Sequence, residues 1–251
     1  GGYNTVTIGA RANAALRVPR ELFSLLKEGV ANRSYDIHDI GAHADAFAEI
    51  AFGHSRDINK QWRVGGTLKF LLGGANMDAK FKQARLDLGV DNWSVVADAE
   101  LQSSVKGLTY KTEVNDDTRH RYVSGMDVDG TGLNGFGMAL DLGAVFTLNR
   151  DWQFSASVLD FGFIHWGNNM VASTNGERHF YTDRYAFNAD NDATNSFDNE
   201  WKKLRNDFSA IYELDDMGDR GGRTTMLAAT LNFAGQYTLP VYRNLTFGLM
   251  N

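Results

Sequence analysis

Apolar and polar residues alternate along most of this chain. Between residues 4 and 18 every second position is apolar, whereas the intervening positions include Arg11 and Arg17. Because successive side chains of a β-strand point to opposite faces, a period of two predicts a strand with one apolar face. The pattern recurs over 135–148 and, more weakly, over seven further segments. These segments are 44–53, 62–73, 84–90, 93–102, 152–158, 227–233 and 245–249.

The connections between these nine predicted strands alternate in length. In chain order they are 19–41 (long), 54–61 (short), 76–83 (medium), 91–92 (short), 103–134 (long), 149–151 (short), 167–222 (very long) and 240–244 (short). Outer-membrane barrels show short periplasmic turns and long extracellular loops, whereas a soluble β-sandwich has no reason to keep its long loops at one end. A phase slip near 159–160 indicates a β-bulge.

Aromatic residues supply separate support for a barrel. Trp62, Trp93 and Trp152 each begin a strand after a short turn, and we expect Phe52 and Tyr237 at the same level of neighbouring strands. This is typical of the aromatic girdle at a membrane interface; the alternative is ordinary core aromatics at the end of a sandwich. The sequence therefore predicts an all-β fold, a transmembrane antiparallel up-and-down β-barrel. An odd strand count indicates an incomplete segment, so residues 1–251 are expected to be one barrel domain truncated at both ends.

Charged side chains fall on the predicted lumen face, with both signs interleaved. They are Arg11, Arg17, Asp45, Glu49, Arg63, Lys69, Arg85, Asp87, Asp98, Glu100 and Asp141. Two interpretations stay open, a salt-bridged plug and a polar conduit. The mixture of signs argues against strong selectivity for anions or cations.

Two segments have helical rather than strand periodicity. Residues 19–29 predict a short rim helix, since Pro19 suits the first helical position and Gly29 the residue after the end. Within the long extracellular loop, 197–214 predicts a second helix with Ser196 as its N-cap. Its apolar face comprises Phe197, Trp201, Leu204, Phe208, Ile211 and Tyr212. This helix is expected either to cap the barrel mouth or to act as a lid or binding surface.

Composition excludes several other classes. There is no cysteine, so no disulfide framework or cysteine-ligated metal is expected. A net charge of −6 argues against nucleic-acid binding. No cofactor is expected, and no nucleophile or acid–base constellation predicts an enzyme. Asp127 and Asp129 form a weak calcium candidate, for which an Asp/Gly-rich turn is the commoner explanation.

Three stretches resemble motifs of an uncharacterised Bacteroidota outer-membrane barrel family. They are the strand over 61–73, the hairpin over 137–146 and 157–166, and the early turn over 19–23. That family is related in architecture to barrels that resemble the long-chain fatty-acid transporter and the type IX secretion shuttle. The resemblance implies a fold and a bacterial outer-membrane location, and no established activity.

Two function hypotheses follow. The first is passage or uptake of a small molecule, including a hydrophobic one, by an outer-membrane barrel in contact with lipid and lipopolysaccharide. The alternative is a non-transporting surface or assembly component that binds an outer-membrane protein partner.

Overall fold

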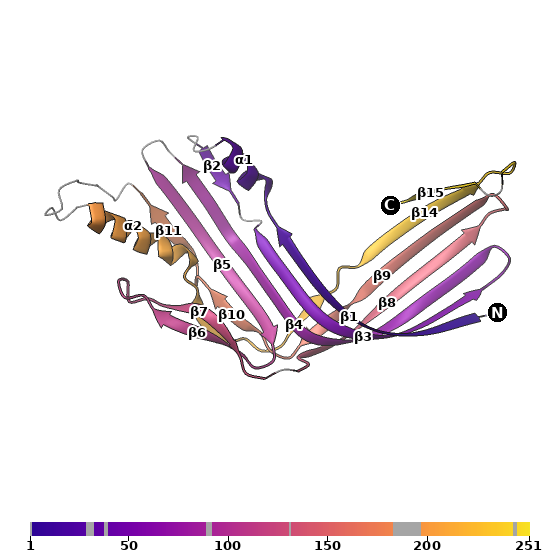
Figure 1. The fold of residues 1–251 in the computed structure, drawn as a ribbon, viewed down its shortest axis with the longest axis horizontal. Coiled ribbons are helices and arrows are strands. Elements are labelled where there is room, and N and C mark those ends of the chain that lie inside the picture. The colour runs from indigo at the N-terminus through magenta and orange to yellow at the C-terminus, as the bar shows by residue number, and fades with distance from the viewer. Residues whose placement is uncertain are drawn as a thin grey trace.

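The fold is built on one large antiparallel β-sheet bent into two arms (Figure 1). The computed structural model describes residues 2–28, 33–37, 40–88, 92–130, 132–182, 197–242 and 245–251. Thirteen strands form this sheet, and two more form a separate hairpin. The prediction of an all-β, antiparallel fold is confirmed. Among the described residues the sheet stays open, because β1 (Gly2–Arg17) pairs only with β3 and β15 (Thr246–Met250) only with β14.

The longest strands form the framework of both arms. They are β3 (Gly41–Asp57), β4 (Trp62–Leu88), β5 (Trp93–Val105), β8 (Gly135–Thr147), β9 (Trp152–Trp166) and β14 (Thr230–Thr238). The shorter elements are α1 (Arg20–Glu28), β2 (Arg33–Asp36), β6 (Leu108–Val114), β7 (Arg121–Val128), β10 (Met170–Ser173), β11 (Arg178–Tyr181), α2 (Phe197–Tyr212), β12 (Asp215–Asp219) and β13 (Arg223–Met226).

One strand, β4, runs through both arms. Its first half pairs with β8 and its second half with β5, on the same edge. The medium loop predicted over 76–83 is therefore wrong, since these residues continue the strand. Register shifts at Gly74 and Lys82 explain the error, because each bulge changes the phase of the alternation.

The continuity of β4 also changes the pattern of connections. The turn after β3 and the connection between β4 and β5 are both short, and they lie at opposite ends of β4. The predicted strict alternation of short and long connections is thus wrong. Two of the predicted long loops also contain strands, since 103–134 includes the β6–β7 hairpin and 167–222 includes β10, β11 and β12.

The sheet has two chemically different faces. We call the polar face the one that carries Arg11, Glu49 and Lys69, and the apolar face the one that carries Ile8 and Phe70. On the arm formed by β8, β9, β14 and β15 with the first half of β4 and the adjoining parts of β1 and β3, which we call the open arm, the apolar face is solvent-exposed.

On the other arm, formed by β5, β10 and β11 with the end of β4, which we call the covered arm, other elements shield the apolar face. Ile211 of α2 packs there against Ala97 and Phe180, and the β6–β7 hairpin packs through Leu108 and Tyr110 on Ala172.

Both predicted helices are confirmed. The rim helix corresponds to α1 and the loop helix to α2, each within two residues of its predicted end. Ser196, the predicted N-cap of α2, and Gly29, the predicted residue after α1, lie outside the described residues. Of the helices that the structure describes, none is long and apolar enough to cross a membrane.

A small apolar core sits at the bend on the polar face. Trp166 is fully buried among Phe47, Leu71 and Ile164, and its indole N–H donates to Thr225 Oγ1 at 2.8 Å. A Cβ at Gly73 would lie 2.6 Å from the Trp166 ring, so glycine there makes room for the indole. This core divides the polar face into two separate polar regions.

Candidate functional site

The strand register places all the predicted lumen residues on the polar face. The bulges at Gly74 and Lys82 restore this arrangement along β4, so that Lys69, Arg85 and Asp87 share the face. That this face lines a lumen stays a prediction. The structure brings four of these side chains together and distributes the others along the two arms.

Five charged side chains from five strands form the central ion-pair cluster. They are Arg11 of β1, Glu49 of β3, Lys69 of β4, Asp141 of β8 and Asp160 of β9. Arg11 contacts Glu49 at 3.0 Å and Asp160 at 2.8 Å. Lys69 Nζ lies 2.7 Å from Asp141 and 2.6 Å from Asp160. The Lys69 side chain is only 6% exposed, so this cation is held between two carboxylates away from water.

Local backbone geometry explains how Asp160 enters the cluster. The register of β8 on β9 shifts at this point, and Asp160 has a φ of +56°. Its backbone N–H donates to Asp141 Oδ1 at 2.8 Å, which closes the bulge. Next to it, a Cβ at Gly162 would lie 2.2 Å from the Met138 carbonyl oxygen, so β8 and β9 approach more closely than a side chain permits.

The cluster also gives a physical reason for the sequence motifs. Lys69 belongs to the strand motif, and Asp141 and Asp160 belong to the two halves of the hairpin motif. These residues, far apart in the chain, meet in one set of ion pairs. Three carboxylates face two cations, and the curvature of the sheet lets Arg11 of the edge strand reach Asp160 across β3, β4 and β8.

A second polar region lies on the covered arm around Arg223 of β13. Its guanidinium contacts Asp78 at 2.6 Å and Ser104 at 3.1 Å, and it also donates to Asn76 and Gln102. Asp78 in turn binds His43 Nδ1 at 2.6 Å. Arg223 thereby ties a late segment of the chain to β4 and β5.

The remaining predicted lumen residues lie in smaller pairs. Arg63 pairs with Asp57 at 2.7 Å, and Arg85 with Asp87 at 3.1 Å. Glu100 contacts Lys80 and Lys82. The other members form hydrogen bonds or line a pocket: Asp98 accepts from Thr174 Oγ1, Asp45 accepts from Asn13 Nδ2, and Arg17 lines a pocket beside Arg223.

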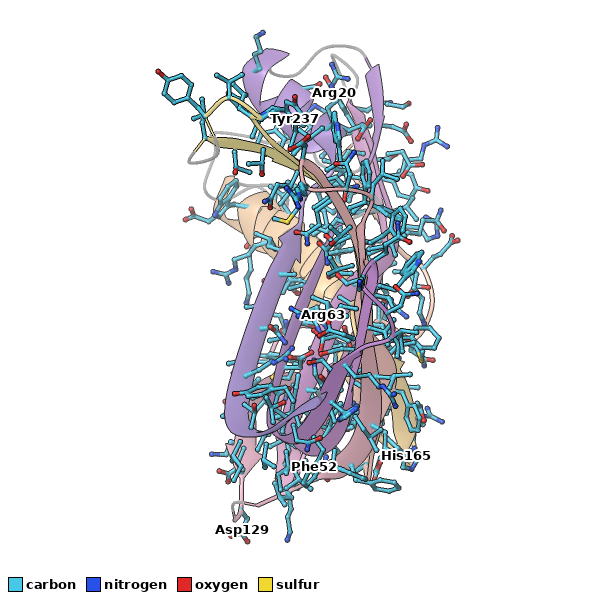
Figure 2. All side chains as sticks on the ribbon, turned by 90° about the vertical axis from the view of Figure 1, so that its right-hand side faces the viewer. Arg20, Phe52, Arg63, Asp129, His165 and Tyr237 are labelled. Atoms are coloured by element: carbon cyan, nitrogen blue, oxygen red, sulfur yellow. The ribbon has the colours of Figure 1, made fainter. Side chains whose placement is uncertain are left out.

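The predicted girdle aromatics separate into different levels. The rings of Trp62 and Phe146 have centroids 4.7 Å apart, and those of Trp152 and Tyr237 have centroids 4.6 Å apart. All four lie at the short-turn end of the open arm. Trp93 pairs with Leu88 at the far end of the covered arm, because β4 is continuous. Phe52 pairs with Leu68, about 20 Å along the strand from Trp62. Figure 2 shows Phe52 and Tyr237 well apart.

A third cluster joins the elements that cover the apolar face. His120, beside the β6–β7 turn, contacts Glu213 at 2.9 Å and Asp215 at 2.5 Å. Carboxylates only accept hydrogen bonds, so both ring nitrogens donate and the imidazole is charged. The bond to Glu213, followed by the bond to Asp215, raises the pKa of His120 above its ordinary value. Burial raises the pKa of Glu213, but bonds from His120 and Asn115 outweigh it and lower that pKa.

The apolar residues of α2 are only partly shielded. Ile211 is buried and Leu204 half-buried against β11, whereas Trp201 and Tyr212 are exposed. The side chains of Phe197 and Phe208 lie outside the described residues. The helix therefore covers the outer strands of the covered arm.

The calcium candidate carries no metal-like geometry. Asp127 pairs with Lys111 at 3.4 Å, and the Asp129 backbone N–H donates to the Gly107 carbonyl oxygen. Among the described residues, no three His, Cys, Asp or Glu side chains lie in an arrangement that could hold a metal ion.

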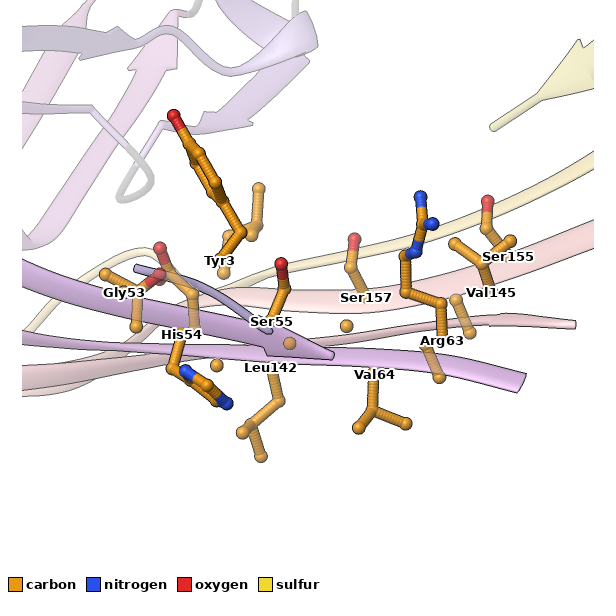
Figure 3. A pocket seen from close by; sticks show the side chains of 18 of the residues that line it. Tyr3, Gly53, His54, Ser55, Arg63, Val64, Leu142, Val145, Ser155 and Ser157 are labelled. Carbon is orange, nitrogen blue, oxygen red and sulfur yellow. The ribbon is translucent and has the colours of Figure 1, made fainter. Parts of the chain in front are cut away.

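A shallow groove of about 390 Å³ lies on the polar face between the central ion-pair cluster and the short-turn end (Figure 3). Small side chains such as Ser55, Thr67 and Ser157 line it, with Asp141 at one end and Arg63 at the other.

Several site residues were not found by sequence reasoning. Asp160 lies in the β-bulge, where the alternation does not assign a residue to either face, although the phase slip in the sequence indicates the bulge itself. His120 occurs in the predicted loop 103–134, Glu213 near the end of the predicted helix 197–214, and Arg223 between the predicted loop 167–222 and the next strand. Their partners lie on strands far away in the chain, and no local spacing encodes such contacts.

Comparison with family models matches residues 1–251 to a family of unknown function (DUF5723). No curated protein matches the chain, and no solved structure does. The resemblance therefore supplies a family and no activity.

Proposed function

Since the chain belongs to the DUF5723 family of unknown function, we propose a role from its own geometry: it forms the wall of an integral outer-membrane β-barrel. The observation that carries the proposal is the exposed apolar face of the open arm. Large apolar side chains stand exposed on seven strands, among them Ile8, Phe70, Phe136, Phe154, Phe233 and Leu249. Soluble proteins rarely expose continuous apolar surface of this extent.

The size of the open arm suits a bilayer. Its strands β8 and β9 contain 13 and 15 residues, and about 9–11 tilted residues cross the hydrocarbon layer. Trp62, Trp152 and Tyr237 gather at the short-turn end, where amphipathic rings favour a membrane interface. In this orientation the short turns face the periplasm, and the covered arm extends outside the bilayer.

The free edges of the sheet belong to the same proposal. Unpaired backbone groups are not tolerated in hydrocarbon, so the free edges of β1 and β15 must be paired in the membrane, with each other or with other strands. In the closed barrel of this proposal the polar face lines the interior. The central ion-pair cluster then spans the interior at mid-height.

A matched pair of substitutions tests the membrane assignment. Leu140→Arg places a charge on the apolar face of the open arm, at an expected cost of about 2–4 kcal/mol in a bilayer. Thr67→Arg places the same charge at the same level on the polar face, beside Asp141. We expect Leu140→Arg alone to reduce the amount of protein that resists carbonate extraction from outer membranes. Equal recovery of the two variants, or a wild-type protein that is extracted without detergent, contradicts the proposal.

A second candidate, passage of a small molecule, is favoured by the groove on the polar face (Figure 3). The small side chains that line this groove leave space as far as the central ion-pair cluster. There the cluster narrows the space through which a molecule would pass. Swelling of liposomes that contain the purified protein measures such passage. Swelling equal to that of empty vesicles, for sugars and for small amphiphiles alike, favours the non-transporting alternative.

A further inference from the structure

Two adjoining grooves mark the apolar face of the open arm near the short-turn end. The first, of about 610 Å³, has apolar walls that include Val64, Leu142 and Leu231. The second, of about 740 Å³, has Trp62, Phe154 and Phe233 in its walls. Ala144 and Ala156 line both grooves. The grooves therefore adjoin in one apolar trough, which we call the lipid trough and which spans β4, β8, β9 and β14.

Basic side chains border one side of this trough. Arg56 and His54, near the end of β3, line the first groove together with Val64. Figure 3 shows His54 on the same side of the sheet as Val64 and Leu142, opposite Ser55, Ser157 and Arg63. Arg56 follows two positions after His54 on the strand, so it shares this face. It is exposed, and among the described residues it takes part in no ion pair.

An arginine on a membrane-facing surface is costly unless it reaches the interface and binds an anion there. Arg56 is level with Val64, two residues from Trp62 at the aromatic end, so its guanidinium can reach headgroup depth. A cation beside an apolar trough is complementary to an amphiphile with an anionic head and an acyl tail. Guanidinium groups bind phosphate oxygens in a bidentate manner, which adds geometric selectivity.

We propose that the lipid trough binds an anionic phospholipid from the leaflet on the short-turn side. Arg56 holds the phosphate with His54 beside it, and the acyl chain lies along the trough over Ala144 and Ala156. The proposal rests on the membrane role proposed above. It goes further, because bulk lipid would coat any apolar face without preference for headgroup charge or for this position.

The chain supplies a matched control for the cation. Arg63 lies one residue from Val64, at the same end of the sheet, but on the polar face and paired with Asp57. Arg56→Gln and Arg63→Gln therefore make the same chemical change on opposite faces. A third variant, Ala156→Phe, fills the part that the two grooves share and keeps both arginines.

The test is native mass spectrometry of the protein released from detergent and titrated with phosphatidylglycerol or with phosphatidylcholine. We expect Arg56→Gln to weaken phosphatidylglycerol binding about fivefold, the effect of one basic residue at an anionic surface. Phosphatidylcholine binding should stay unchanged in that variant, while Ala156→Phe should weaken both lipids. Arg63→Gln should bind as the wild type does.

Equal phosphatidylglycerol affinity of Arg56→Gln and the wild type overturns the proposal, as does an equal loss in Arg63→Gln or no preference of the wild type for the anionic lipid. Vesicle flotation of the same preparations separates this failure from that of the membrane role. Protein that floats with vesicles but shows no effect of Arg56→Gln contradicts the lipid trough alone. Protein that does not float contradicts the membrane role itself.

Discussion

At the scale of single residues, Lys69 has the least exposed side chain among the described ion-paired residues of the polar face. Its ammonium group contacts Asp141 and Asp160, and almost none of its side chain is exposed. Taking a charge out of water costs free energy that only close partners offset. Removing this cation would leave Asp141 without its ion-pair partner and Asp160 with Arg11 alone.

We therefore expect Lys69→Met to destabilise the fold strongly. Breaking a buried ion pair costs about 3 kcal/mol, the lower part of the usual range, because both carboxylates keep some exposure. The urea midpoint of unfolding in detergent micelles measures the loss. Arg63→Gln, which removes an exposed pair, should leave the midpoint nearly unchanged. A midpoint shift for Lys69→Met no larger than that of Arg63→Gln would show that the central ion-pair cluster is not stabilising.

Gly162 is constrained by backbone contact rather than by charge. A methyl group there would lie 2.2 Å from the Met138 carbonyl oxygen and 2.5 Å from the Ala139 Cα. Neither atom belongs to a flexible side chain, so the two strands would have to separate at the Asp160 bulge.

Gly162→Ala should consequently reduce the yield of folded protein severely. Gly143→Ala is the control, because its nearest contact would be an ordinary 3.6 Å to the Ser157 Cβ. The fraction of heat-modifiable band on unboiled gels reports the folded amount. Normal folding of Gly162→Ala, or an equal defect in both variants, would contradict the packing argument.

At the scale of elements, His120 couples the β6–β7 turn to the segment that follows α2. Its charged form binds Glu213 and Asp215, and Asp215 also contacts Arg178 of β11 at 3.3 Å. A group whose folded pKa is raised stabilises the structure fully below its unfolded pKa and loses that effect as the pH rises through the folded pKa. The pKa of His120 is raised from an ordinary 6.5 and that of Glu213 is lowered from 4.5. The ion pair between His120 and Glu213 is therefore strongest between pH 4.5 and pH 6.5.

We expect the β6–β7 hairpin to loosen as the pH rises above neutrality. Hydrogen exchange of Arg121–Val128, corrected for intrinsic rates, should be faster at pH 8.5 than at pH 6. The His120→Gln variant should exchange at a faster rate that is the same at both pH values. An unchanged pH response in this variant would assign the effect to other groups.

The elements also show what the sequence could and could not predict. Alternation predicted most of the long strands, because one face is apolar throughout the open arm. Residues 76–81 alternate as strictly as their neighbours, yet the bulge at Gly74 shifts their phase, so the sequence pattern predicts a loop there. The short strands β10–β13 carry little alternation, since they contribute few side chains to a continuous apolar surface.

The sequence predicts which residues of the candidate site share a face of the sheet, but not which of them form ion pairs with one another. A strand register fixes which residues share a face, and this placed Arg11, Glu49, Lys69 and Asp141 together. Which of them touch depends on the curvature of the sheet, since Arg11 reaches Asp160 across three intervening strands. Curvature arises from twist and bulges over the whole sheet, and no local spacing specifies it.

At the scale of the whole molecule, the two arms differ in whether other elements of the chain cover the apolar face. The covered arm shields it with α2 and the β6–β7 hairpin, whereas the open arm leaves it bare. A protein surrounded only by water would gain from covering both. This contrast follows if lipid covers the open arm and the covered arm stands in water.

Cysteine accessibility tests this division directly, since the sequence has no cysteine of its own. Leu142 and Ser157 are near neighbours on β8 and β9 that point to opposite faces (Figure 3). In outer-membrane fragments whose two surfaces are both accessible to the reagent, a charged maleimide should label Ser157→Cys. It should leave Leu142→Cys unlabelled until the protein is unfolded. Leu142 is 49% exposed on the isolated chain, more than enough for reaction in water. Rapid labelling of Leu142→Cys in intact membranes would therefore mean that this face meets water, and the assignment of the open arm to the bilayer would be wrong.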